Sequence, residues 1–420
     1  MRERLSALAP RTRAVLWAAL LAALPGCASE AGDGGGPARA ADGSGGATRV
    51  VTDSRGVAVQ IPSTPLRVAT VSDGLVEEVM IVLGVAHRLV GIGSTCLVRE
   101  FRYEYETASG STFTVSGGMG PARYLMPALA ELPHFVASGT EPNYEALAAL
   151  EPDLVIVDVG ACTLPWQSDP EAMRRGLARL ESLGIPTVVL QGPNSGGAPG
   201  PEGVTRVLGV LGDVFGKPEE AARLAATVEE PVRWVRERTR DIPADERAQV
   251  LLLGLDPRVR GQGTVGRAFG TSDAQSYLLE EIVGATNAYR RRAGGILSLE
   301  QLLALDPDVI ILPTSNGYHP PRELVEGPSF RGLGTLRAIR DERVGALPWS
   351  PCNCDKRLEY PLDALVMAKT VYPERFRDLD LAERILRFYQ DAYGVDEETA
   401  SNLLDAQWLG WTREDAGHGG

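Results

Sequence analysis

Four cysteines could bind a metal. Each follows, directly or after a short turn, an apolar run typical of a buried strand; they are Cys96, Cys162, Cys352 and Cys354. Ligands of open α/β sheets lie beyond the carboxyl ends of the strands, so we expect these thiols to converge there. Thiolates are the soft ligands that select copper(I), zinc or iron–sulfur clusters, and they also bind haem iron. Disulfide pairing is the alternative, because oxidising compartments join cysteines by default.

Aromatic and cationic side chains follow the same strand ends. The residues expected to contact a ligand, together with Cys96 and Cys162, are Trp166, Tyr318, His319, Trp349 and Arg357. Among them, His319 is a candidate axial metal ligand. The hydroxyl residues Ser94 and Thr163 also follow predicted strands.

A thiol enzyme is a competing interpretation of the same residues. His319 paired with Cys162 or Cys354 would supply a base and a nucleophile. No known signature frames these cysteines, and the chain has no G-x-S-x-G, phosphate-binding glycine loop or H-E-x-x-H motif. We therefore expect a binding protein without catalytic activity.

The elements that would position these residues alternate along the chain. Short apolar runs alternate with helical patterns, which is typical of parallel α/β structure. After a hairpin formed by 49–52 and 57–61, the expected strands are 66–71, 89–93, 154–159, 186–190, 249–254, 309–312 and 343–347. Ser72 and Asp73 are expected to cap a helix that runs to Leu83.

One Gly-rich stretch, 99–127, has low periodicity, and we expect it to be an excursion from the sheet. Some of its aromatic side chains are expected to face a ligand; they are Tyr103, Tyr105, Phe113 and Tyr124.

A helix–strand unit occurs twice. Residues 143–157 and 298–312 match at seven of fifteen positions, 155 residues apart, and each contains a Pro-Asp stop before a β-branched run. Proline ends the helix because its ring and missing N–H cannot continue it. Glu145 and Glu300 occupy the same place in the two copies. Two copies of one unit predict two similar lobes.

Between the copies, residues 218–240 keep apolar side chains at helical spacing. This pattern predicts one long helix that joins the lobes. Pro231 lies inside it, where proline is expected to kink or break a helix.

The first residues are typical of an export signal. Arginines precede the apolar run 14–24, which is too short to span a bilayer comfortably. Leu24-Pro25-Gly26-Cys27 resembles a bacterial lipobox, which implies that residues 1–26 are removed and Cys27 is lipidated. Residues 27–48 are then a Gly- and Ala-rich tether. The net charge of −13 argues against nucleic acid as a partner.

Several segments together resemble one protein family. These are VTDSRGVAVQIPSTPLRVATVS, YEALAALEPDLVIV, LGIPTVVL, SLEQLLALDPDVIIL and LGTLRAIRDERVGALP. Their order is similar to that in the helical-backbone periplasmic binding proteins of ABC importers for ferric siderophores, haem and cobalamin. The resemblance covers 49–394 and implies two Rossmann-like α/β lobes joined by a single long helix, with the ligand in a cleft between them. It also implies that Glu145 and Glu300 dock the lobes onto the permease.

The sequence thus predicts an extracytoplasmic substrate-binding lipoprotein of an ABC importer. The expected lobes are 49–217 and 241–420, joined by the helix 218–240. We expect a monomer with no intrinsic cofactor, whose ligand is an iron complex or related metal chelate such as a siderophore, haem or corrinoid. The implied partners are the permease and, through it, the ATPase. The alternatives are a binder of a cysteine-ligated metal or iron–sulfur species, and a ligand sensor.

Overall fold

The computed structural model describes residues 47–94, 96–137, 139–160, 163–191, 202–260, 263–313, 320–349 and 357–415. Within these ranges, no helix combines the length and the apolar character needed to span a membrane.

The first half of the chain forms a four-stranded parallel sheet with the order β4-β3-β7-β8. A separate hairpin, β1–β2, precedes it. The elements are β1 (Thr48–Thr52), β2 (Ala58–Pro62), β3 (Val68–Val71), α1 (Leu75–Val82), β4 (Leu89–Ile92), β5 (Phe101–Glu106), β6 (Thr112–Gly118), α2 (Pro121–Leu125), α3 (Tyr144–Ala149), β7 (Leu154–Asp158), α4 (Pro170–Glu181), β8 (Thr187–Leu190) and α5 (Glu202–Phe215).

The second half forms a mixed sheet. Its order is β12-β10-β9-β13-β14, with β11 also paired to β9. Strands β9, β11, β13 and β14 run parallel, whereas β10 pairs antiparallel with β9 and β12. The elements are β9 (Gln249–Gly254), β10 (Thr264–Ala268), α7 (Ala274–Tyr277), β11 (Thr286–Asn287), β12 (Gly295–Ser298), α8 (Leu299–Leu305), β13 (Val309–Leu312), α9 (Pro321–Glu326), α10 (Arg337–Arg340), β14 (Val344–Ala346), α11 (Tyr360–Val371), α12 (Leu381–Tyr393), α13 (Glu397–Ala406) and α14 (Trp411–Asp415).

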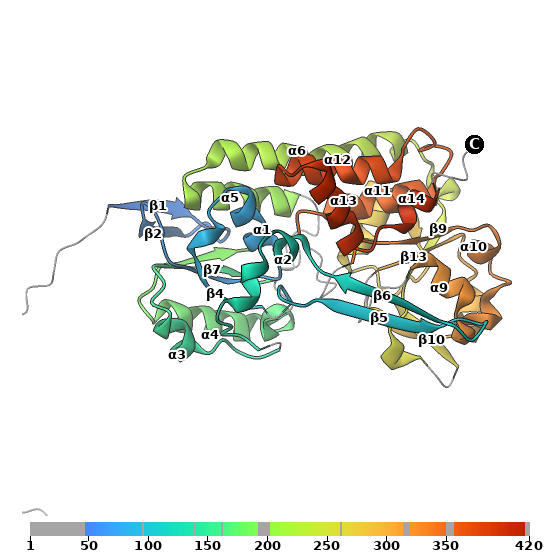
Figure 1. The fold of residues 1–420 in the computed structure, drawn as a ribbon, viewed down its shortest axis with the longest axis horizontal. Helices are drawn as coiled ribbons and strands as arrows, with labels where there is room; N and C mark the ends of the chain where they lie inside the picture. Colours follow the sequence, from blue (N-terminus) through green and yellow to red (C-terminus); the bar gives the residue numbers. More distant parts are fainter. Residues whose placement is uncertain are drawn as a thin grey trace, which may run out of the picture. The chain divides into compact units, whose positions relative to one another are not determined.

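The long helix α6 (Pro218–Thr239) separates the two sheets along the chain. It continues through Pro231, which is buried, so the expected break does not occur. In Figure 1, α6 lies above both sheets together with α5, α11 and α12. The structure therefore confirms the predicted α/β fold of two lobes joined by one long helix.

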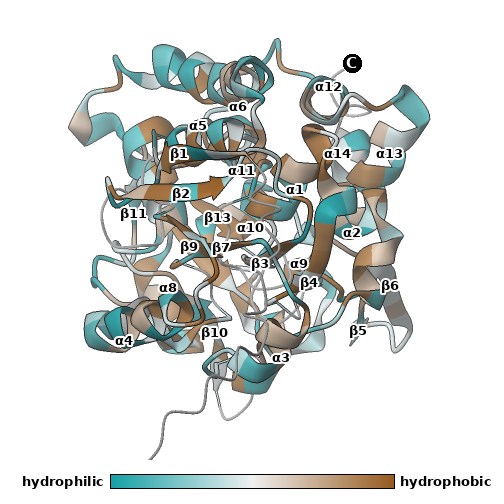
Figure 2. Cartoon of the chain, turned by 90° about the vertical axis from the view of Figure 1, so that its left-hand side faces the viewer, coloured by the Kyte–Doolittle hydropathy of each residue, from teal (hydrophilic) through white to brown (hydrophobic). Residues whose placement is uncertain are grey.

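The two faces of each central strand pack into different cores. Leu154 and Ile156 of β7 contribute to a hydrophobic core that also contains alternate residues of β9 and β13. The intervening Val155 and Val157 belong to a second core, confined to the first lobe. Side chains alternate across a strand, so each parallel strand is apolar on both faces. Figure 2 shows these central strands as the hydrophobic interior of the molecule. One core thus continues through both lobes.

The sequence repeat corresponds to two helix–strand units, α3–β7 and α8–β13. Asn143 and Ser298 cap the two helices with their side chains. Before each proline the backbone is left-handed, with φ of 47° at Glu151 and 35° at Asp306. The repeat therefore includes the helix stop as well as the apolar positions.

The Gly-rich stretch contains regular structure that we did not expect. β5 and β6 form an antiparallel hairpin, here called the arm (residues 101–118), which extends from the first lobe across the second (Figure 1). Tyr103 and Tyr105 of the arm are buried in the core of the second lobe. The Tyr103 hydroxyl donates to Glu323 over 2.7 Å, and the carboxylate of Glu323 pairs with Arg260 over 2.8 Å. These tyrosines therefore join the lobes instead of facing a ligand.

Two helical glycines provide a matched test of the packing. A Cβ at Gly176 of α4 would lie 2.0 Å from the buried Trp166 ring, whereas one at Gly209 of α5 would meet nothing within 4 Å. We expect Gly176→Ala to lower the free energy of unfolding by about 1–3 kcal/mol through overpacking. Gly209→Ala should raise it by about 0.5–1 kcal/mol, because alanine loses less backbone entropy in a helix. Urea titration of both variants measures the difference, and equal effects would contradict this packing.

Candidate functional site

Three polar side chains meet beyond the carboxyl ends of the parallel strands β3, β4 and β7. The hydroxyl of Ser94 donates to the Asp73 carboxylate over 2.8 Å, and the hydroxyl of Thr163 donates to it over 2.7 Å. The two hydroxyl oxygens lie 2.9 Å apart. Ser94 and Thr163 are fully buried, whereas Asp73 is partly exposed. We call Asp73, Ser94 and Thr163 the strand-end cluster; it lies where parallel sheets hold ligands.

A tight turn places Asp73 in this cluster. The Ser72 hydroxyl oxygen accepts hydrogen bonds from the backbone N–H groups of Gly74 and Val76, both over 3.2 Å. Gly74 has a φ of 140°, a conformation that L side chains rarely adopt. The N-cap residue of α1 is Gly74, not Ser72 or Asp73 as expected; Ser72 stabilises the turn before it, while Asp73 bonds the side chains at the neighbouring strand ends.

Cys96 lies directly beside the strand-end cluster. Its backbone N–H donates to the Ser94 hydroxyl oxygen over 3.2 Å, and its side chain is disulfide-bonded. The bonded partner lies outside the described residues. A sulfur atom in a disulfide is no longer the thiolate that binds metal. Of the two alternatives for Cys96, the structure therefore contains the disulfide. Metal binding by Cys96 stays a prediction for the reduced protein.

Arg357 of the second lobe approaches the same turn. A Cβ atom added to Gly74 would lie 3.5 Å from Cγ of Arg357. The guanidinium is buried, lies 3.7 Å from the Glu359 carboxylate and donates to the carbonyl oxygen of Trp349 over 3.3 Å. Arg357 thus pairs within the protein, and the predicted direct contact with a ligand is not supported by this placement.

Two buried carboxyls surround that guanidinium. Glu78 of α1 accepts from the backbone N–H of Leu358 over 3.1 Å, and Glu359 accepts from the Tyr393 hydroxyl. Burial raises the pKa of Glu78 well above its usual range, and the nearby Glu359 charge adds to this rise. Burial likewise raises the pKa of Glu359, against the opposing charge of Arg357. These groups connect the first lobe to the second beneath the strand-end cluster.

Two predicted ligand contacts belong to hydrophobic cores instead. Trp166 is 2% exposed, and its indole N–H donates to Glu141 over 2.9 Å. Trp349 is 1% exposed, and its ring lies about 6 Å from those of Phe101 and Trp408. Both large rings follow strands, as predicted, but they turn into the lobes. This placement does not favour their expected role as ligand contacts, which stays a prediction.

The remaining predicted residues fall into two groups. Glu145 and Glu300 are exposed in the first turns of α3 and α8, and Figure 2 places both helices on the side of the molecule away from α6. The others lie outside the described residues; they are Cys27, Cys162, Tyr318, His319, Cys352 and Cys354. In the part of the chain that the structure describes, no three His, Cys, Asp or Glu side chains are grouped to hold a metal ion.

Asp73 is the member of the cluster that the sequence pattern placed in a helix cap. Its place in the sequence could have identified it, because Asp73 follows β3 just as Ser94 follows β4 and Thr163 follows the end of β7. Assigning it to the helix cap obscured that pattern.

The two lobes, the connecting helix and polar side chains gathered at parallel strand ends define a solute-binding architecture. Residues 71–333 match the family described as periplasmic binding protein, and the chain belongs to that family. Proteins of this family bind solutes for transport, act outside the cytoplasm and work with the permeases of ABC transporters.

Individual relatives agree with this assignment. The molybdate-binding protein MolA of Haemophilus influenzae is 25% identical over 273 residues, which cover 60% of this chain and 70% of MolA. A periplasmic solute-binding protein from Veillonella parvula has a similar fold, with a TM-score of 0.61 and 21% identity over 87% of this chain and all of that one. The TroA-like periplasmic binding protein FepB of the same species gives a TM-score of 0.62 and 18% identity, covering 81% of this chain and 95% of FepB. The fold similarity confirms the predicted two-lobed architecture.

Glu77 beneath the cluster provides a test by pH. Burial raises the pKa of its carboxyl from 4.5 to about 7, although the Thr70 hydroxyl donates to it. The folded protein prefers the protonated Glu77 carboxyl. The contribution of this group to the free energy of unfolding is therefore complete below pH 4.5 and is lost as the pH rises to about 7. The loss amounts to about 3 kcal/mol.

We expect Glu77→Gln to remove this pH dependence, since glutamine does not titrate. Urea unfolding at about pH 4.5 and about pH 7.5 should show a larger loss of stability in the unsubstituted protein than in the variant. The exposed Glu374→Gln serves as the control. Parallel pH profiles for all three proteins would show that Glu77 ionises normally.

Proposed function

We propose that this protein is the extracytoplasmic substrate-binding lipoprotein of an ABC importer and that it captures a metal-bearing small ligand. The proposed ligand is an iron complex or related chelate, such as a siderophore, haem or corrinoid. The observation that carries the proposal is the strand-end cluster of Asp73, Ser94 and Thr163, within a chain of the periplasmic binding protein family. Ser94 and Thr163 are buried and hold the Asp73 carboxylate, which is partly exposed and suited to accept hydrogen bonds from the hydroxyl, amide or ammonium groups of such a chelate.

A free metal oxyanion is the second candidate. The relative from Haemophilus influenzae is named as a molybdate-binding protein, and it is similar over 60% of this chain. The hydroxyls of Ser94 and Thr163 already donate to Asp73, and the Asp73 carboxylate would repel an oxyanion. The charge at the cluster therefore favours a neutral or cationic chelate over a free oxyanion.

Binding measurements separate the two candidates. We expect the protein, purified anaerobically, to bind at least one member of a panel of ferric siderophores, haemin and cobalamin, as measured by absorption spectroscopy and calorimetry. Asp73→Asn should weaken this binding by about tenfold, which corresponds to about 1.4 kcal/mol, since it removes a charged acceptor. Asp169→Asn is the control, because Asp169 caps α4 away from the cluster and asparagine also caps helices. Binding of molybdate alone would support the second candidate, and equal effects of both variants would remove the cluster from the site.

The cysteine-ligated alternative has its own test on the same protein. If Cys162, Cys352 and Cys354 bind metal with Cys96, the reduced protein should take up a thiophilic metal and the oxidised protein should not. Thiol counting before and after metal titration measures this difference. Metal uptake that does not depend on reduction would contradict thiolate ligation.

We further propose that Glu145 and Glu300 dock the two lobes onto the permease. Both are exposed and begin repeat-related helices, so each lobe presents one carboxylate in an equivalent setting. Reversing both charges to arginine should reduce ligand uptake into vesicles that contain the permease by about tenfold or more, because buried charge pairs at interfaces contribute strongly. Ligand affinity should stay unchanged. The double reversal of Glu151 and Glu374, which are also exposed, is the control; equal uptake by both variants would exclude docking through these residues.

Lipid anchoring at Cys27 remains part of the proposal. Several acyl chains on one cysteine would hold the protein at the membrane, whereas a single chain binds only marginally. Cys27→Ala should release a soluble protein that still binds its ligand. Mass spectrometry of the mature N-terminus checks this, and an unmodified Cys27 in membrane-bound protein would contradict it.

A further inference from the structure

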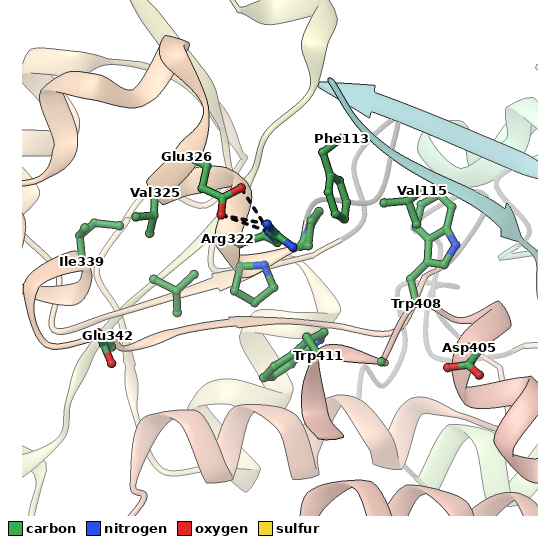
Figure 3. Close-up of a pocket in the computed structure, with 14 residues that line it drawn as sticks. Phe113, Val115, Arg322, Val325, Glu326, Ile339, Glu342, Asp405, Trp408 and Trp411 are labelled. Carbon is green, nitrogen blue, oxygen red and sulfur yellow. Dashed lines mark hydrogen bonds and ion pairs between the residues drawn. The ribbon is translucent and has the colours of Figure 1, made fainter. Parts of the chain in front are cut away.

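The second lobe has a cavity of about 550 Å³ that the proposed function does not use. It is open to solvent and is lined by residues of the arm, α9, α10, β14 and the C-terminal helices (Figure 3). Its volume lies within the range of about 300–1,000 Å³ that is usual for small-molecule sites. The cavity can therefore hold a compact organic molecule.

This cavity is separate from the strand-end cluster. Ile339 and Glu342 precede Val344, the first residue of β14, so the cavity adjoins the amino end of that strand. The cluster of Asp73, Ser94 and Thr163 lies instead at carboxyl ends in the other sheet. A ligand in one site would contact none of the residues that form the other.

Aromatic and aliphatic side chains line most of the cavity. They include Phe113, Val115, Val325, Ile339, Trp408 and Trp411. Val325 is 64% exposed, which is unusual for a large apolar side chain beside several others. Concave apolar surfaces of this kind typically mark binding sites, since burial of the surface by a ligand is favourable.

The charges around the cavity are mainly negative. Glu342 and Asp405 lie on opposite sides of it in Figure 3, and Asp405 pairs with Arg413. Glu342 is exposed, and no basic side chain of the described residues forms an ion pair with it. An occupant with a positive charge would therefore find a carboxylate available.

The protein's own Arg322 shows how this site accommodates a cation. Its guanidinium carbon lies 4.6 Å from the centre of the Phe113 ring, and the group pairs with Glu326 over 3.0 Å. Aromatic faces attract cations through their quadrupole, and a carboxylate adds direct charge attraction. The partly buried Trp411 lines the same cavity.

From these observations we infer that the cavity is a second binding site, specific for an organic cation with an apolar body. The apolar body is buried against Trp411, Val325 and Ile339, and the positive charge is paired with Glu342. Burial of apolar surface supplies most of the affinity, and the carboxylate selects cations over anions of the same shape.

Tetraphenylphosphonium and its anionic counterpart tetraphenylborate are suitable probes, because they have nearly the same shape and opposite charges. Calorimetry on the full mature protein should show that the cation binds about tenfold or more tightly than the anion. Glu342→Arg should weaken cation binding by about fivefold or more. Glu151→Arg is a close control, since Glu151 and Glu342 are both exposed and both have a positive φ, of 47° and 53°.

A second pair of variants tests the apolar part. Val325→Trp should fill the cavity and abolish binding of the cation. Val50→Trp should leave binding unchanged, because Val50 is equally exposed, at 66%, but lies on β1. Circular dichroism confirms that both variants are folded.

Several results would overturn the inference. Equal binding of the two probes, or equal effects of Glu342→Arg and Glu151→Arg, would exclude selection by Glu342. Loss of cation binding in Asp73→Asn would place the probe at the strand-end cluster. A dimer in sedimentation experiments that Val325→Trp disperses would assign the cavity to a second copy of the chain.

Discussion

Arg357 carries a buried positive charge at the junction of the two lobes, among the carboxyls of Glu78 and Glu359. A buried guanidinium is stable only where acceptors surround it, because its transfer from water is costly. The carbonyl oxygen of Trp349 accepts a hydrogen bond from the guanidinium, the Glu359 carboxylate lies 3.7 Å from it, and the buried Glu78 of α1 is close enough to interact with its charge. Removing one partner of such a group typically costs about 3–5 kcal/mol. The turn that carries Asp73 is consequently held against the second lobe.

Two further features also resist separation of the two lobes. One hydrophobic core contains strands of both sheets together with α6 and α11, and the arm buries Tyr103 and Tyr105 in the second lobe. A shared core resists opening, since separation would expose apolar surface to water. The strand-end cluster is therefore preorganised, and a preorganised site loses less conformational entropy when a ligand binds.

The sequence predicts the parallel strands well because they are buried on both faces and appear as uninterrupted apolar runs. It also predicts the repeat, including the proline after each helix. The arm is harder to recognise, although Phe101, Tyr103 and Tyr105 alternate with charged residues as in a strand; the neighbouring glycines hide this pattern. The burial of Trp166 and Trp349 depends on tertiary contacts, such as the space left by Gly176, which no local pattern reveals.

The central claim is that the ligand lies between the lobes, at the carboxyl ends of the parallel strands. The most direct test is anomalous diffraction at the absorption edge of the metal, from crystals of the protein loaded with the chelate that it binds. The account predicts one strong peak next to the strand-end cluster, with the chelate in direct or water-mediated contact with Asp73. A peak elsewhere, for example in the cavity beside Trp408 and Trp411, would contradict it.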